Sequence, residues 1–254
     1  MHKVVAIIPA RYGSTRFPGK LLATLKGKTI IQRVFEQVSA ASLVDSVYVA
    51  TDDKRIFDAV NGFGGNAVMT STSHTCGTDR IAEVAKNMEC DIIINVQGDE
   101  PFIRPEMVDD TIMLLRDDMS ASISSLAVKI ESKDDIMSPH TVKVVADDED
   151  YALYFSRSPI PYYRDEWSDL NSILFRSGET VVFKHIGIYA FRKDSLMKFS
   201  SMAKCKLEEV EKLEQLRALN CGMKIKIKET EYNTFGIDTI EDLRKAEKCQ
   251  SIFL

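Results

Sequence analysis

The chain has 254 residues, of which 44% are hydrophobic, so it contains enough apolar material for a sizeable buried core. Its 33 basic and 38 acidic residues are intermixed and give a formal net charge of -5. A chain with this balance has no overall field that attracts nucleic acid or an anionic membrane. Any polyanion must therefore be bound by a local site.

The N-terminal sequence and the cysteines predict a cytoplasmic protein. The apolar run Val4 to Ile8 stops at Pro9 and is much shorter than the ~20 residues of a membrane span or the core of a signal peptide. Five cysteines occur at wide spacing and without a C-x-x-C pair: Cys76, Cys90, Cys205, Cys221 and Cys249. This pattern favours reduced thiols over a disulfide framework or a zinc site.

The first part of the chain alternates between strand and helix patterns. Short apolar runs rich in β-branched residues predict strands buried on both faces: Val4 to Ile8, Val47 to Ala50, Ala67 to Met69 and Ile92 to Val96. Segments of helical period separate them: Ile30 to Ser39, Arg55 to Val60, and Asp79 to Met88 with Thr78 as its N-cap. The alternation predicts a mostly parallel α/β sheet.

After Pro105 the pattern becomes mixed. Strand-like composition at Ala121 to Ile130, Thr141 to Ala146, Tyr151 to Phe155 and Lys184 to Phe191 predicts partly antiparallel structure. Residues 162 to 180 are polar and without period, which favours a mobile loop. Two helices are expected near the end, one over Leu207 to Leu219 with the apolar stripe Leu207, Val210, Leu213 and Leu216, and one over Ile240 to Lys248.

The segment Ile8 to Leu22, IPARYGSTRFPGKLL, has the composition of a phosphate-binding loop at the C-terminal end of a strand. It holds cations, hydroxyls and glycines within ten residues: Arg11, Gly13, Ser14, Thr15, Arg16, Gly19 and Lys20. Glycines let backbone amides approach phosphate oxygens, and the cations neutralise charge that moves onto departing diphosphate. The alternative is a solvated basic loop. Lys20 is expected to be exposed and to contribute little to stability.

The segment Val96 to Pro101, VQGDEP, places acidic residues directly after a buried strand. Asp99 is the natural magnesium ligand there, because Mg²⁺ takes one or two protein carboxylates and completes its shell with phosphates and water. The alternative is an aspartate that caps a turn. Asp238 is a second candidate, although by itself it is more simply explained as a helix-start residue beside Thr239.

A series of further blocks completes the pattern: VATDD, CGTDR, YALYFSRSPIP, KHIGIYAF, KLEQLRAL and GIDTIEDL. In this order, and over residues 3 to 248, the blocks closely resemble the 3-deoxy-manno-octulosonate (Kdo) cytidylyltransferase family. The first block alone indicates only the wider group of sugar-acid cytidylyltransferases, and the later blocks point to the Kdo branch. The chain departs from the family pattern at Leu21, Cys76 and Asp79, and it keeps Arg80.

The resemblance implies a single α/β domain with a Rossmann-like, mostly parallel nucleotide-binding sheet of the GT-A type and a smaller mixed, partly antiparallel subregion. It assigns residues 1–118 mainly to CTP binding, 119–235 mainly to sugar binding and dimerisation, and 236–254 to a returning metal-site segment and the C-terminal helix. It also implies that CTP and Kdo are converted to CMP-Kdo and diphosphate with Mg²⁺, for lipopolysaccharide biosynthesis, by a cytoplasmic homodimer without nucleic acid or membrane insertion.

Matching positions give each site residue an implied role. The catalytic set is Arg16, Lys20, Asp99 and Asp238, of which Asp99 and Asp238 are the metal ligands. CTP is assigned to Ala10, Arg11, Ser14, Arg16, Lys20, Gly77, Thr78, Arg80 and Gln97, with Arg80 and Gln97 near the base. The sugar is assigned to Arg164, His185, Tyr189, Glu214 and Gln215, where Arg or His can bind the carboxylate and the others can bind hydroxyls.

Without the resemblance, several of these residues have plainer interpretations. Arg80 would be a surface charge, His185 a core histidine, and Glu214 with Gln215 the solvated side of a helix. The loop from Arg164 onward is a candidate for closure over the sugar.

Competing functions are a cytidylyltransferase for 8-amino-Kdo or a nonulosonic acid, a GT-A glycosyltransferase, and a non-catalytic nucleotide sensor. A P-loop ATPase is disfavoured because Leu21 follows Lys20. A dinucleotide oxidoreductase is disfavoured because the glycine cluster at residues 62–65 follows a helix.

Overall fold

The computed structural model describes residues 2–164 and 182–248. Within them, nine strands form one sheet in the order β11-β7-β10-β6-β1-β4-β5, and β8 joins β9 to β10. The strands are β1 Val4–Ala10, β4 Ser46–Thr51, β5 Ala67–Met69, β6 Ile92–Val96, β7 Ile123–Lys129, β8 Lys143–Ala146, β9 Ala152–Ser156, β10 Phe183–Arg192 and β11 Ile225–Glu229. A small hairpin, β2 Thr24–Leu25 with β3 Lys28–Thr29, lies apart.

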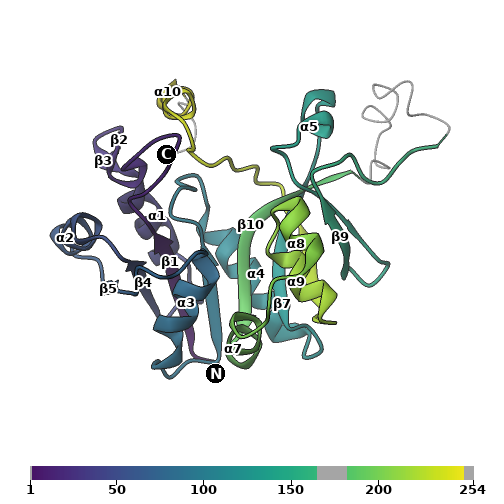
Figure 1. Cartoon of the computed structure of the whole chain (residues 1–254), viewed down its shortest axis with the longest axis horizontal. Coiled ribbons are helices and arrows are strands. Elements are labelled where there is room, and N and C mark those ends of the chain that lie inside the picture. Colours follow the sequence, from purple (N-terminus) through teal and green to yellow (C-terminus); the bar gives the residue numbers. More distant parts are fainter. Residues whose placement is uncertain (1, 165–181, 249–254) are drawn as a thin grey trace.

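The described helices surround this sheet in Figure 1. They are α1 Ile30–Ser39, α2 Lys54–Gly62, α3 Gly77–Lys86, α4 Pro105–Asp117, α5 Lys133–Met137, α7 Lys193–Ser200, α8 Lys206–Glu211, α9 Gln215–Asn220 and α10 Ile240–Lys248. A 3-10 turn, η1, covers Lys20–Leu22.

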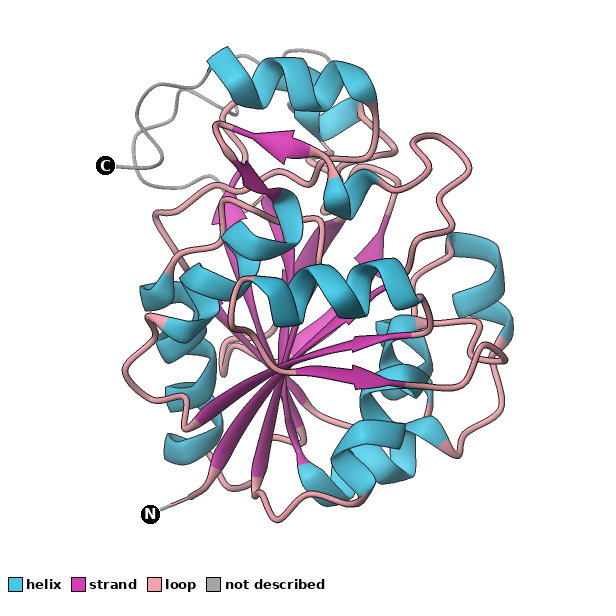
Figure 2. Ribbon diagram, turned by 90° about the vertical axis from the view of Figure 1, so that its left-hand side faces the viewer, coloured by secondary structure: helices cyan, strands magenta, loops and turns pink. Residues whose placement is uncertain are grey.

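The sheet combines parallel and antiparallel pairing, as the sequence predicted. β1 pairs in parallel with β4 and β6, and β5 continues this parallel part. β10 runs antiparallel to β6, β7 and β8. Figure 2 shows the twisted strands with helices on both sides. The expected α/β fold with a smaller mixed subregion is therefore confirmed.

Alternation along β1 builds the cores on the two faces. Val4, Ala6 and Ile8 belong to one hydrophobic cluster with residues of α1, α2 and α4, whereas Val5 and Ile7 belong to the other with residues of α3, α7 and α9. All seven residues of β1 are buried, which explains why the strand reads as an unbroken apolar run.

The connections place a binding region at the ends of β1 and β6. From β1 the chain passes through α1 to β4 on one side, and later through α3 to β6 on the other side. The loops that follow β1 and β6 consequently diverge at a topological switch point, where open α/β sheets bind ligands.

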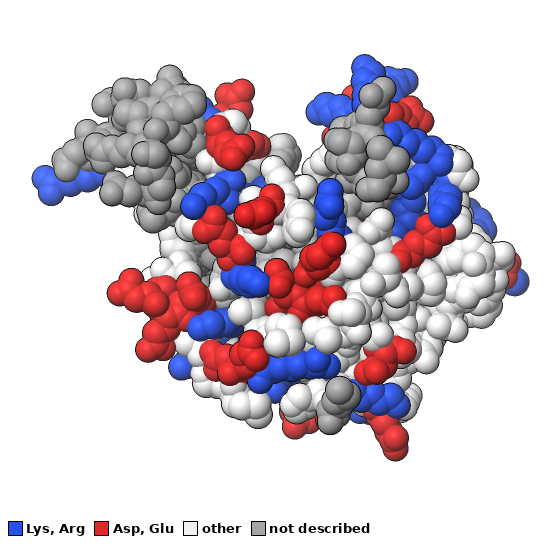
Figure 3. Space-filling view, turned by 180° about the vertical axis from the view of Figure 1, so that it is seen from behind, with Lys and Arg blue, Asp and Glu red and all other residues white. Residues whose placement is uncertain are grey.

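Charged side chains of both signs are interspersed over the face seen in Figure 3, in line with the composition of the chain. The described cysteines, Cys76, Cys90, Cys205 and Cys221, are free.

Two expectations about local structure are wrong. Helix α3 begins at Gly77, and its cap is Cys76 rather than Thr78, because the Cys76 Sγ accepts a hydrogen bond from the Asp79 amide at 3.4 Å. The helix expected over residues 207–219 is broken at Lys212, which adopts a left-handed conformation with φ 55° and ψ 45°.

The break divides the expected apolar stripe. Leu213 and Leu216 are buried, whereas Leu207 and Val210 are 43% and 72% exposed. In their place a salt bridge between Glu208 and Arg217 is buried where α8 meets α9, with Nη2 and Oε1 2.8 Å apart. This helical corner therefore combines a buried ion pair with the apolar packing of Leu213 and Leu216.

Candidate functional site

The loop after β1 wraps around a glycine that no other residue could replace without strain. Gly19 has φ +70°, and a Cβ at this position would lie 2.9 Å from the ring of Tyr12. Its amide donates a hydrogen bond to the Tyr12 carbonyl at 3.0 Å. The close packing folds the loop back on itself and directs Lys20 toward the end of β6.

Lys20 lies between two carboxylates from distant parts of the chain. Its Nζ donates to Asp99 and, at 2.7 Å, to Asp238 Oδ1, while Arg16 Nη2 donates to Asp238 Oδ2 at 2.7 Å. Lys20 is only 9% exposed, so the expectation of an exposed loop lysine is wrong. The reason is tertiary, because its ammonium group lies between Asp99 and Asp238, which come from distant parts of the chain.

The pKa shifts of Lys20 and Asp238 are consistent with each other, because each shift favours the charged form of its group. Burial by itself would lower the pKa of the Lys20 ammonium, but Asp99 and Asp238 outweigh it and raise that pKa. Burial by itself would raise the pKa of Asp238, but Lys20 and Arg16 outweigh it and lower that pKa. Each group is consequently held in its charged form.

The returning segment 234–238 brings Asp238 to this place by docking against the loop after β6. The buried Ile237 donates its amide to the Asp99 carbonyl at 2.8 Å. Phe235 packs on Phe102 with ring centroids 4.5 Å apart. At Gly236 a Cβ would lie 3.2 Å from Glu100 Oε1, so a residue without a side chain allows the close approach.

Two cavities open beside this cluster. The smaller, of about 410 Å³, lies along the loop after β1 and is lined by most of the predicted CTP residues: Ala10, Arg11, Ser14, Arg16, Lys20, Gly77, Arg80 and Gln97. The larger, of about 820 Å³, is lined by four of the predicted sugar residues: His185, Tyr189, Glu214 and Gln215.

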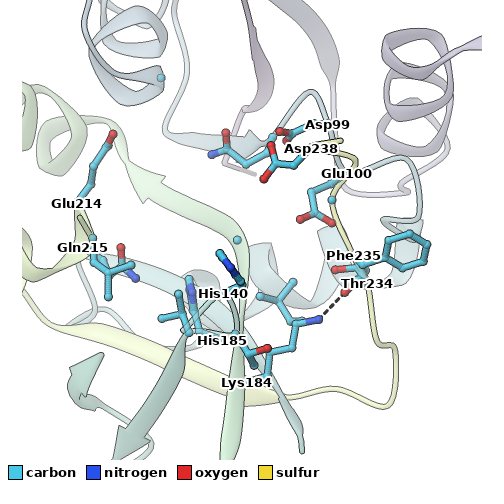
Figure 4. A pocket seen from close by; sticks show the side chains of 18 of the residues that line it. Asp99, Glu100, His140, Lys184, His185, Glu214, Gln215, Thr234, Phe235 and Asp238 are labelled. Atoms are coloured by element: carbon cyan, nitrogen blue, oxygen red, sulfur yellow. Dashed lines mark hydrogen bonds between the residues drawn. The ribbon is translucent and has the colours of Figure 1, made fainter. Parts of the chain in front are cut away.

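Six residues line both cavities: Arg16, Gly77, Gln97, Asp99, Glu214 and Asp238. In Figure 4 the carboxylates of Asp99 and Asp238 lie next to each other at the edge of the pocket. Asp99 and Asp238, the two expected metal ligands, therefore lie where the cavities meet.

Arg80 and Thr78 are not arranged as simple base-reading side chains. Arg80 is 4% exposed, and its guanidinium donates to Thr70 and, at 2.7 Å, to Asp52 Oδ2. Thr78 lines the larger cavity rather than the smaller one, and its hydroxyl donates to Glu214 Oε2 at 2.7 Å. Thr78 was expected on the nucleotide side, and the structure instead joins it to a residue expected on the sugar side.

His185 is buried and paired in the larger cavity. Its Nε2 lies 2.9 Å from Ser125 Oγ, and its ring meets Phe155 edge-on at 4.9 Å between centroids. Burial lowers the pKa of His185 to about 3. It is therefore a neutral hydrogen-bonding partner near pH 7, and any contact with a carboxylate would be a hydrogen bond from its ring N–H rather than an ion pair.

Tyr189 lies beside His185 with ring centroids 5.3 Å apart. Burial, followed by the charge of Glu214, raises the pKa of its phenol, so the phenol stays protonated and can donate a hydrogen bond.

Arg164 is not brought into the site. It is exposed and lines neither cavity. Most of the loop expected to close over the sugar, residues 165–180, lies outside the described residues.

Seven charged or titratable residues of the larger cavity were not among the predicted site residues: Glu100, Asp135, His140, Lys184, Lys212, Asp242 and Lys245. The Oε2 atom of Glu100 is buried and has no hydrogen-bond partner among residues 2–164 and 182–248, and burial followed by the charge of Asp99 raises the Glu100 pKa to about 7. Lys184 donates to the Thr234 carbonyl at 2.5 Å, the contact drawn in Figure 4. Glu100 stands directly beside Asp99 and Lys184 opens the block KHIGIYAF, whereas His140 lies in none of the blocks that carry the resemblance.

In the described part of the chain, no three histidine, cysteine or acidic side chains are grouped as a metal site. The Asp99 and Asp238 carboxylates nevertheless converge on one cationic group, the Lys20 ammonium. A pair of carboxylates that leaves the rest of the shell open fits Mg²⁺, which keeps water and substrate phosphates as its other ligands. None of the described helices is both long and apolar enough to cross a membrane.

Comparison with known proteins supplies the context for this geometry. Residues 5–225 match the family described as Cytidylyltransferase. Proteins named 3-deoxy-manno-octulosonate cytidylyltransferase from Trichlorobacter lovleyi and Geotalea uraniireducens are 51% and 53% identical to this chain, covering 97% and 96% of it and 98% and 97% of their own lengths. A solved structure of CMP:2-keto-3-deoxy-manno-octonic acid synthetase complexed with CTP superposes with a TM-score of 0.88 at 44% identity, covering 96% of this chain and 97% of that one.

Proposed function

The chain belongs to the 3-deoxy-manno-octulosonate cytidylyltransferase family, and we propose that it transfers a cytidylyl group from CTP to Kdo to give CMP-Kdo and diphosphate. The observation that carries this proposal is that Asp99 and Asp238 line both cavities. Nucleotidyl transfer requires the α-phosphate of one substrate and a hydroxyl of the other to meet at one place. The shared wall of the two cavities supplies that place.

In the proposed reaction the anomeric hydroxyl oxygen of the sugar attacks the α-phosphorus of CTP. A bond forms between them, the bond from the α-phosphorus to the bridging oxygen breaks, and diphosphate leaves with the electron pair. The hydroxyl proton is released to solvent. The protein must align the weak nucleophile and stabilise the charge that develops on the leaving group.

The smaller cavity is suited to hold CTP. Arg11, Arg16 and Lys20 supply positive charge for the triphosphate, and the backbone and hydroxyl groups of the loop, including Ser14, supply donors. Gln97 and the backbone at Ala10 and Gly77 are the groups proposed to face the cytosine. Arg80 also lines this cavity, where we assign it a supporting role because its guanidinium is already paired with Asp52.

We assign Mg²⁺ to Asp99 and Asp238. The ion would supply positive charge next to the α-phosphate and lower the pKa of a hydroxyl bound to it. Lys20 and Arg16, which neutralise the two carboxylates here, would then be available to the triphosphate.

The larger cavity is suited to a polyhydroxylated acid. Glu214 and Gln215 can accept and donate hydrogen bonds to several hydroxyls, and neutral His185 and protonated Tyr189 add directional contacts. Lys184 and His140 line the same cavity and replace Arg164 as candidates for the sugar carboxylate.

The decisive experiment follows diphosphate release from CTP and Mg²⁺ with Kdo, 8-amino-Kdo or a nonulosonic acid. Fastest turnover with Kdo supports the proposal, and preference for another acid replaces the substrate but keeps the reaction. No release with any acid would overturn it and return attention to a glycosyltransferase or a nucleotide sensor. Asp99→Asn should abolish release while CTP binding persists, whereas unchanged turnover would exclude the metal assignment.

We further propose that the protein is a cytoplasmic homodimer and that its product, CMP-Kdo, is used in lipopolysaccharide biosynthesis. Large apolar side chains are exposed on β9 and α8, namely Leu153 at 61%, Leu207 at 43% and Val210 at 72%. A second copy of the chain packed against them would remove these apolar side chains from water. Light scattering tests this: Val210→Glu should shift the mass toward the monomer, and a wild-type monomer would contradict the assignment.

A further inference from the structure

The hydrogen bond between Thr78 and Glu214 connects two segments that are 136 residues apart. Thr78 lies in the first turn of α3 and is 6% exposed. Its neighbour Gly77 lines both cavities, whereas Thr78 lines only the larger one. The first turn of α3 therefore lies where the two cavities meet, and Thr78 belongs to the wall of the larger one.

Glu214 is placed so that its side chain serves the site rather than its own helix. It occupies the N-cap position of α9 but makes no side-chain hydrogen bond to the amides of that helix. Its carboxylate instead reaches the N-terminal end of α3, where the helix dipole favours negative charge. Figure 4 shows Glu214 extending away from His185.

Only one of the two carboxylate oxygens of Glu214 accepts a hydrogen bond from the described residues. Oε2 accepts the Thr78 hydroxyl, while Oε1 accepts no hydrogen bond from the described residues. A glutamate side chain has three rotatable bonds and loses considerable freedom when it is fixed. The contact with Thr78 supplies the restraint.

We propose that Thr78 is a positioning residue, which fixes Glu214 at the boundary of the two cavities so that its free oxygen accepts a hydroxyl of the sugar acid. The inference rests on the proposed function, because it takes the sugar acid as the ligand of the larger cavity. It assigns Thr78 to sugar recognition rather than to recognition of the cytosine. A hydrogen bond to a charged group is strong enough for about a tenfold effect on binding.

The test compares Thr78→Val, which keeps the shape but removes the hydroxyl, with Thr78→Ser, which keeps the hydroxyl. Thr78→Val should raise the KM for Kdo about tenfold and leave the Kd for CTP, measured calorimetrically without sugar, within about twofold of wild type. Thr78→Ser should restore the KM for Kdo. In a Glu214→Ala background, Thr78→Val should have no further effect on that KM.

Several outcomes would overturn the inference. A weaker Kd for CTP in Thr78→Val would assign the hydroxyl to the nucleotide. An unchanged KM for Kdo would remove the positioning role, and an equal loss in Thr78→Ser or an additive loss with Glu214→Ala would make the effect merely structural. A wild-type protein that releases no diphosphate overturns the proposed function itself, and is thereby distinguished from failure of this inference alone.

Discussion

Replacing Lys20 by methionine should weaken folding as well as activity. Methionine keeps the length of the aliphatic stem but leaves Asp99 and Asp238 facing each other without their shared cation. Removing one partner of a fully buried ion pair costs ~3–5 kcal/mol. The side chain of Asp238 is 45% exposed and that of Asp99 is 28% exposed, so water compensates in part. We therefore expect a loss of about 2 kcal/mol in the free energy of unfolding.

Equilibrium unfolding in urea measures this loss, which corresponds to a fall in Tm of roughly 4–8 °C for a chain of this size. The matched control is Lys20→Met combined with Asp238→Asn, in which one of the opposing charges is also removed. If repulsion causes the loss, the double variant should recover about half of it.

The kinetic consequence is independent of the stability loss. Diphosphate release by Lys20→Met should fall by about 100-fold or more at temperatures where the variant is folded, because a preorganised positive charge is missing from the triphosphate site. A variant as stable as wild type, or a double variant with the full loss, would refute the electrostatic account of the cluster. Unchanged turnover would refute the placement of Lys20 on the triphosphate.

Three further predictions concern stability and binding at other positions in the chain. Glu208→Gln leaves the 3% exposed Arg217 guanidinium with an uncompensated charge and should cost about 3 kcal/mol in urea unfolding; a loss below about 1 kcal/mol would mean that the ion pair contributes little. Gly19→Ala forces a Cβ against the Tyr12 ring at positive φ, so the KM for CTP should rise several-fold, and an unaltered KM would contradict the assigned loop geometry. His185 has a pKa of about 3 in the folded chain against about 6.5 in the unfolded chain, so the unfolded chain binds more protons between these values. Stability should therefore be fully present above pH ~6.5 and fall by roughly 2 kcal/mol at pH 5, and His185→Gln should flatten that dependence.

The sequence predicted the elements whose pattern is local. Helix α1 and strands β5 and β6 have the expected bounds, because turn residues or a capping threonine delimit uniform apolar periods there. Helix α4 was missed although its buried residues have helical spacing: Met107, Val108, Thr111, Ile112 and Leu115. Pro105 interrupts the strand and helix alternation of the sequence, but at the first helical position proline begins a helix.

The site was predictable only in part, for a related reason. Residue types and strand ends located the loop after β1 and Asp99 at the wall of one cavity, since both depend on the sequence around them. The approach of Asp238 depends on Ile237 entering the core and on its amide reaching the Asp99 carbonyl, which no spacing in the chain reveals. The burial of Lys20 and the hydrogen bond between Thr78 and Glu214 likewise depend on contacts between segments that are far apart in the chain.

Mutual neutralisation explains how two cationic and two anionic side chains can share one wall of the cavities. Arg16 and Lys20 are paired with Asp238 and Asp99, so the cluster is half-buried at modest electrostatic cost. Under the proposed roles, a triphosphate would take the cations and a magnesium ion would take the carboxylates. Either ligand alone would leave the opposite partners unpaired, whereas the two together satisfy all four. CTP and Mg²⁺ should therefore bind cooperatively, each strengthening the other by the same factor.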